Sequence, residues 1–149
     1  MFRALFCSLI FSAASLLAQE TAQPPLPAIS LSINGKTVQA EVADEQLERM
    51  TGLMFREKLA PDSGMLFIMP RPDQVSFYMK NTILPLSIAY INHAGVILEI
   101  HDLQPKNETP VPSAFPTIAY ALEMEQGWFS KNNILAGDRL RGLPPLTGR

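Results

Sequence analysis

The segment Ile29–Ala43, with the sequence ISLSINGKTVQAEVA, decides the fold class. Apolar and polar residues alternate in Ile29–Ile33 and again in Lys36–Ala43, which is typical of strands that bury one face. Asn34-Gly35 separates the two runs, and this dipeptide is the strongest short signal of a two-residue β-hairpin turn. The segment therefore predicts an antiparallel hairpin at the start of the folded domain.

The sequence beyond this hairpin contains further runs of strand length. Met65–Met69 (MLFIM) is continuously apolar, so we expect a strand that is buried on both faces. Pro70–Asp73 contains two prolines and is expected to break that strand. Further strands are expected at Val75–Thr82, Leu84–Ile91, Val96–His101 and Ile118–Met124.

Two short helices are expected beside these strands. Asp44 can cap the first, in which Leu47, Met50 and Leu53 recur at helical spacing and predict one apolar stripe. Gly127–Asn132 is expected to form the second. We therefore expect an α+β, mainly β domain, built as an antiparallel sandwich or partly closed barrel with one short N-terminal helix and one short C-terminal helix.

Composition sets broad limits on the function. The chain has 149 residues, 12 Lys+Arg, 14 Asp+Glu and a formal net charge of −2. This mild acidity argues against a nucleic-acid partner, because binding phosphates needs a concentrated positive surface. Hydrophobic residues make up 47%, enough for a packed core, and the single cysteine excludes a disulfide framework and a cysteine-based zinc cluster. No feature of the sequence indicates the oligomeric state.

The first residues have the pattern of an export signal. A short positive start, Met1–Arg3, precedes the uncharged run Ala4–Leu17, which is shorter than the ~20 residues that span a bilayer. Cleavage is expected after Ala18 or after Ala14, although an uncleaved anchor or a buried N-terminal helix would also fit the pattern. We expect an exported protein, periplasmic or extracellular, with no membrane span once the signal is removed.

The rest of the chain divides by composition. Residues 1–18 are the expected signal peptide, residues 19–27 a Pro-rich linker, residues 28–143 a single β-rich domain, and residues 144–149 a tail. The one long loop is Gln104–Thr117, which carries four prolines.

The densest polar group beside the apolar runs is Lys80-Asn81-Thr82. With Arg56, these side chains are candidates to bind a small polar or anionic ligand. On a regular strand Lys80 and Thr82 share a face that Asn81 does not, so convergence requires the strand to end or bulge there. The alternative is a structural turn with Lys80 in solvent and Arg56 in a surface salt bridge. Our hypothesis is that Arg56 and Lys80 face one cleft.

Glu99 is a further candidate for ligand binding. It lies two residues before His101, so both point to one face of a strand, where a carboxylate can orient an imidazole or share a metal. The simpler interpretation is an exposed polar face at the end of the strand. His93 is the only other histidine, and zinc usually takes three or four ligands, so we expect no metal and no cofactor. Glu123 is one of several other carboxylates, and the simpler interpretation is that these side chains lie exposed to solvent at the edge of the domain.

Several short segments occur in an order that is specific as a set. They are Gly52–Arg56, Gly64–Phe67, Phe77–Thr82, Leu84–Leu86, Tyr90-Ile91, Gly95–Ile97, Leu122-Glu123 and Gly137-Asp138. Over roughly residues 36–141 the chain resembles the family called domain of unknown function 192 (DUF192). The resemblance implies a compact β-rich domain, often exported, and it supplies no catalytic residue. The chain departs from the family at Ser87, where members commonly have Asp, and it lacks the cysteines that some members place in the Pro-rich loop.

These observations favour a non-catalytic binding module that contacts a small polar ligand or an extracytoplasmic protein. The alternative is a hydrolase-like enzyme in which Lys80 or Arg56 stabilises an anion and Glu99 or Glu123 acts as the base. A third option is a structural factor that protects another envelope protein through its Pro-rich loop.

Two surface features would discriminate between these functions. Convergence of the basic side chains with a carboxylate in one pocket would favour ligand binding or catalysis. A flat apolar patch near Phe115 or Trp128 would favour a protein partner.

Overall fold

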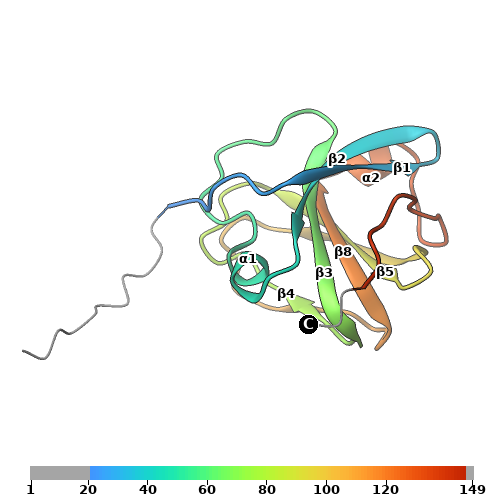
Figure 1. Cartoon of the computed structure of the whole chain (residues 1–149). Helices are drawn as coiled ribbons and strands as arrows, with labels where there is room; N and C mark the ends of the chain where they lie inside the picture. The colour runs from blue at the N-terminus through green and yellow to red at the C-terminus, as the bar shows by residue number, and fades with distance from the viewer. Residues whose placement is uncertain (1–20, 147–149) are drawn as a thin grey trace, which may run out of the picture.

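The computed structural model describes residues 21–146 as one open, six-stranded sheet with a small second sheet and two short helices (Figure 1). The expected signal peptide lies outside the described residues. Across the large sheet the strands are β1 (Ala28–Ile33), β2 (Lys36–Ala43), β3 (Ser63–Asp73), β8 (Ile118–Glu125), β5 (Leu86–Asn92) and β6 (Ile97–Leu103). The small sheet pairs β4 (Ser76–Phe77) with β7 (Val111–Pro112), and the helices are α1 (Gln46–Thr51) and α2 (Trp128–Lys131).

The large sheet is mixed, which corrects the expected antiparallel sandwich or barrel. β2 and β3 run parallel because residues 44–62, including α1, carry the chain back across one face, and the other pairs are antiparallel. β1 and β6 do not pair with each other, so the sheet is open. The C-terminal segment links these two ends through isolated bridges, Ser32 to Arg141 and Val96 to Arg139. Neither helix lies at the N-terminus of the described chain, since two strands precede α1.

The first hairpin forms as the sequence predicts. Asn34 and Gly35 have φ values of 48° and 78°, the left-handed pair that a tight two-residue turn requires. β1 and β2 then pair in register from Ala28↔Glu41 to Ile33↔Lys36. Gly95 has a left-handed φ of 81° in the loop that joins β5 to β6 as a second antiparallel hairpin.

β3 is buried on both faces over the apolar run, as predicted. Leu66 and Ile68 pack into one core cluster, and Met65 and Phe67 pack into a second cluster. The expected break at Pro70–Asp73 is wrong, because the strand continues to Asp73 through a register shift against β8. The two prolines lie in this irregular stretch, where no regular ladder needs their missing N–H groups.

The strand expected at Val75–Thr82 is also wrong beyond Phe77. The Met79 amide donates to the Asn107 carbonyl (2.8 Å), and the Thr82 amide donates back to Met79 (3.1 Å), which closes a turn. Asn81 has a left-handed φ of 54°, a conformation that Asn adopts more easily than most residues.

Helix α1 does not bury the expected apolar stripe. Leu47 and Met50 are 70% and 64% exposed, and only Leu53, just past the helix end, is buried. The helix is six residues long, and its inward face ends at Gly52, where a Cβ atom would come within 3.3 Å of the Phe67 ring. The cap is Glu45 rather than Asp44, and the Glu48 carboxylate accepts the backbone amides of both residues at 3.1 Å. Large side chains cannot lie beneath so close a contact, so Leu47 and Met50 stay largely exposed.

Three further segments pack onto the sheet. Trp128 is buried, contrary to its expected place on the surface, and its indole N–H donates to Asp62 (2.8 Å). In the Pro-rich loop, the Ala114 amide donates to Glu99 (2.8 Å). In the expected linker, the Gln23 amide group donates to the Gly52 carbonyl (2.8 Å). No helix within residues 21–146 is long and apolar enough to span a membrane.

β8 occupies the centre of the sheet. It pairs with β3 on one side and β5 on the other, although it follows every other strand in chain order (Figure 1). Its side chains alternate between the two core clusters, with Leu122 and Met124 on one face and Ala121 on the other. Glu123 therefore shares the face of Ala121, against which α1 and the segment 75–82 are placed.

Candidate functional site

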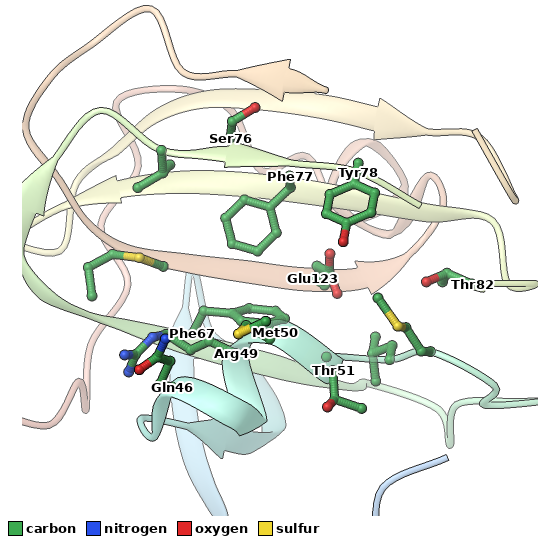
Figure 2. A pocket seen from close by; sticks show the side chains of 15 residues that line it. Gln46, Arg49, Met50, Thr51, Phe67, Ser76, Phe77, Tyr78, Thr82 and Glu123 are labelled. Atoms are coloured by element: carbon green, nitrogen blue, oxygen red, sulfur yellow. The ribbon is translucent and has the colours of Figure 1, made fainter. Parts of the chain in front are cut away.

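A cavity of about 390 Å³ lies between α1, β3, β4 and β8. Its walls are mainly apolar, and its one acidic lining residue is Glu123 from the central strand. Figure 2 shows the carboxyl group of Glu123 among these walls, with Phe77 and Tyr78 on one side and Phe67 and Met50 on the other. The size and character are those of a small-molecule pocket, a mostly apolar concavity with few polar groups.

Glu123 is a buried acid without a partner. It is 5% exposed, and no hydrogen bond or ion pair reaches its carboxyl group from the part of the chain that the structure describes. Burial in this apolar setting disfavours the charged form and raises the pKa of Glu123 to about 8. The group is therefore mainly a neutral carboxylic acid at pH 7, able both to donate and to accept a hydrogen bond.

A close approach of two strands places this acid. Gly64 on β3 faces Met124 in the β3–β8 register, and a Cβ atom on Gly64 would lie 2.1 Å from the Glu123 carbonyl oxygen. Only glycine leaves room for the β8 backbone here. The carboxyl group is thus held by a rigid strand at the centre of the sheet, which fixes its position better than a loop would.

Aromatic rings form much of the wall. Phe67 and Phe77 meet edge to face, with ring centroids 4.9 Å apart and an interplanar angle of 81°. Phe77 also lies 5.9 Å from the ring of Tyr90, which packs behind it. Tyr78 is 45% exposed at the mouth of the cavity.

Tyr90 does not supply Glu123 with a hydrogen bond. Its hydroxyl donates to the carbonyl of Val111 at 2.5 Å. Burial, followed by the nearby acids Glu123 and Glu99, raises the pKa of Tyr90 far above its usual value. This tyrosine is therefore neutral and fixes β7 to the sheet.

One cation, Arg49 of α1, lines the cavity. Its guanidinium group donates to the carbonyls of Asp44 and Ile68, the latter at 3.2 Å. Figure 2 shows it beside Gln46, at the side of the cavity away from Tyr78 and Thr82. Arg49 is thus tied to the backbone and makes no ion pair with Glu123.

The candidates from the Lys80-Asn81-Thr82 group do not converge. Thr82 lines the cavity and is buried, but its hydroxyl donates to the carbonyl of Lys80 (3.1 Å). Lys80 and Asn81 are exposed and line none of the described cavities.

Arg56 lies in a different cavity, on the side of β2. Its guanidinium group pairs with Glu41 at 2.9 Å, and both side chains are mostly buried, at 17% and 21% exposure. The Glu41 carboxylate also accepts the amide of Leu26 at 2.8 Å. Arg56 and Lys80 therefore line no common cleft in this structure, and the Arg56 pair joins β2 to the chain beyond α1.

Glu99 and His101 contact each other, as their shared strand face suggested. The Glu99 carboxylate lies 2.8 Å from the His101 ring and accepts the amides of Ala114 and Phe115. Glu99 thereby fixes the Pro-rich loop against β6. Among residues 21–146, no group of three His, Cys, Asp or Glu side chains could hold a metal ion.

In the sequence, Glu123 is only one of two candidate bases for a hydrolase-like site. The signal was present, because Ile118–Met124 is apolar except for this carboxylate and Tyr120. A strand that is apolar on both faces belongs to the centre of a sheet, and an acid on it must then be buried. The cavity around Glu123 was not visible in the sequence, because α1, β3 and β4 are distant from it along the chain.

The match of a family model assigns the domain. The model of DUF192, described as "Uncharacterized ACR", covers residues 29–142. The chain belongs to the DUF192 family. This assignment confirms the resemblance seen in the ordered segments.

Two solved structures are similar to this DUF192 domain. One is a Sinorhizobium meliloti 1021 protein described provisionally as a transcription regulator, with 33% identity, a TM-score of 0.75, and coverage of 80% of this chain and 97% of that one. The other is a Novosphingobium aromaticivorans DSM 12444 protein of unknown function, with 30% identity, a TM-score of 0.74, and coverage of 84% and 94%. No curated protein matches the chain.

Proposed function

We propose that this DUF192 domain is an exported, non-catalytic binding module that takes a small ligand into the cavity above Glu123. One observation carries the proposal: a buried carboxyl group without a partner lies in a mainly apolar cavity. At 5% exposure the acid is largely withdrawn from bulk water, which makes its charged form costly and raises its pKa. A bound ligand that pairs with it would remove this penalty. Export to the periplasm or the exterior remains the expectation from the leader sequence.

Binding explains the cavity better than hydrolysis does. A hydrolase-like site needs an anion-stabilising cation close to its base. Arg56 is paired with Glu41 in another cavity, and Glu99 is engaged by His101 and the Pro-rich loop. Glu123 is left without a cationic partner or an activated nucleophile among the described residues.

Nucleic-acid binding, which the description of one similar structure suggests, is not part of the proposal. The chain has a formal net charge of −2, whereas phosphate binding requires a positive surface. A protein partner has less support than a small ligand, because Trp128, one of the two aromatic residues expected at such a contact, is buried.

A fragment screen with matched variants tests the proposal. Met50 at the cavity and Leu135 outside it are both exposed, at 64% and 66%, so replacing either by alanine should leave stability nearly unchanged. Fragments that raise the melting temperature of the wild type should bind Met50→Ala several-fold more weakly and Leu135→Ala equally well. If no fragment binds, or if both variants bind hits as the wild type does, the cavity is not the site.

A further inference from the structure

We propose that the ligand of the Glu123 cavity is an organic ammonium ion, a positively charged nitrogen with apolar substituents. This inference rests on the proposed function, since it names the chemical class of ligand for the same cavity. Three features of the described residues support it: a carboxyl group without a partner, aromatic walls around it, and a lining cation that is already bonded elsewhere.

The carboxyl group gives the cavity its polarity. Figure 2 shows the two oxygen atoms of Glu123 directed into the space between Phe77, Tyr78 and Met50. No described residue donates to these oxygens, so a positively charged group would find both of them available. An anionic ligand would gain no attraction from Glu123, because a carboxyl group is either neutral or negatively charged.

The walls favour a cation over an uncharged ligand. Phe67, Phe77 and Tyr78 line the cavity, and the negative face of an aromatic ring attracts a cation within about 6 Å of its centre. Tertiary and quaternary ammonium ions suit such walls, because their methyl groups are apolar and their charge is spread over them. An uncharged carbonyl compound could accept the proton of Glu123, but the rings would add nothing specific to its binding.

Arg49 and two tyrosines are the other charged or titratable groups near Glu123. Arg49 faces the cavity from α1, and its guanidinium group is held by the carbonyls of Asp44 and Ile68. Tyr78 lines the cavity beside β4, and Tyr90 approaches from β5, where burial raises its pKa far above the usual value and keeps its hydroxyl neutral. Arg49 is thus the one cationic side chain lining the cavity, and it is anchored to the backbone.

The acid can be ionised at little cost. Burial raises the pKa of Glu123 to about 8, so at pH 7 roughly one molecule in ten already carries the charge. If the ammonium ion binds only the ionised form, its affinity at pH 7 is only about tenfold lower than its affinity for the fully ionised protein. Binding a cation releases the proton, so the affinity should rise with pH up to about 8 and then level off.

Three probes with one ring distinguish the ligand classes. Calorimetric titration from pH 6 to pH 9 would compare benzyltrimethylammonium, benzyl alcohol and benzoate, none of which changes its charge in this range. The ammonium probe should bind at least tenfold more tightly than benzyl alcohol at pH 8, benzoate should bind most weakly, and only the ammonium affinity should increase with pH. Glu123→Gln should abolish the cation preference and its pH dependence, while binding of benzyl alcohol persists.

The outcomes separate this inference from the proposed function. Equal affinity for the ammonium and the alcohol, or an ammonium affinity that falls as the pH rises, would overturn the ligand class and leave a binding cavity. A cation preference that survives in Glu123→Gln would also overturn it. No binding of any probe, together with an empty fragment screen, would remove both.

Discussion

Replacing Glu123 by glutamine should make the protein more stable at neutral pH and flatten its dependence on pH. Glutamine has nearly the same shape and cannot ionise, so it removes the titration of the buried acid without opening a cavity. The native carboxyl group keeps its proton up to a pKa of about 8, whereas in the unfolded chain it loses the proton near 4.5. Between these values the native state binds more protons than the unfolded state, and stability must fall as the pH rises.

The size of the effect follows from this difference in pKa. Each pH unit between 4.5 and 8 removes about 1.4 kcal/mol from the free energy of unfolding. The total is about 5 kcal/mol across the window, of which about 3 kcal/mol is already lost at pH 7. Glu123→Gln should avoid this loss, so the stability difference between the variant and the wild type should increase steadily from pH 5 to pH 8.

Urea unfolding followed by the fluorescence of Trp128, the one tryptophan, would measure this at half-unit steps of pH. Glu125→Gln is the matched control, because Glu125 lies two residues further along β8 and is exposed. Its profile should run parallel to that of the wild type. Parallel profiles for the wild type and Glu123→Gln would refute the reasoning, since they would mean that the acid is solvated or already paired.

Three other substitutions test the supports of the site by urea unfolding. Gly64→Ala should destabilise the protein by about 3 kcal/mol, because its Cβ atom would overlap the carbonyl oxygen of Glu123; a loss below about 1 kcal/mol would show that the strands can separate. Arg56→Met should lower stability by about 2 kcal/mol, since it leaves Glu41 unpaired, yet leave benzyltrimethylammonium affinity unchanged; a loss of affinity would place Arg56 in the site. Tyr90→Phe should lower stability by about 1 kcal/mol and speed amide hydrogen exchange of Ser113, which β7 positions; unchanged exchange would show that the tyrosine hydroxyl does not hold the loop.

Local patterns predicted the parts of the fold that depend on neighbours in sequence. The Asn34-Gly35 turn and the two-sided burial of Met65–Met69 were correct, because each depends on a few adjacent residues. The parallel pairing of β2 and β3 was missed, since nothing within either strand encodes its partner's direction. The exposure of Leu47 and Met50 was missed because it depends on the close approach of Gly52 to Phe67 on a distant strand.

The candidate site was recovered only in part for the same reason. Thr82 does line the cavity, but its neighbours Lys80 and Asn81, which were expected to join it in one polar site, do not. The group that dominates the cavity is a single acid, Glu123, surrounded by apolar residues from three other segments. Its burial could be inferred from its place in an apolar strand, whereas its lack of a partner depends on tertiary packing.

The central position of β8 in the sheet differs from its late position in the order of synthesis. A ribosome makes β1, β2, β3, β5 and β6 before the strand that must lie between β3 and β5 exists. Without residues 118–125 the facing edges of β3 and β5 lack their common partner strand, and such edges readily pair with the wrong neighbours. The strand that completes the sheet is thus also the strand that carries the acid into the cavity, so one segment of eight residues serves both the fold and the site.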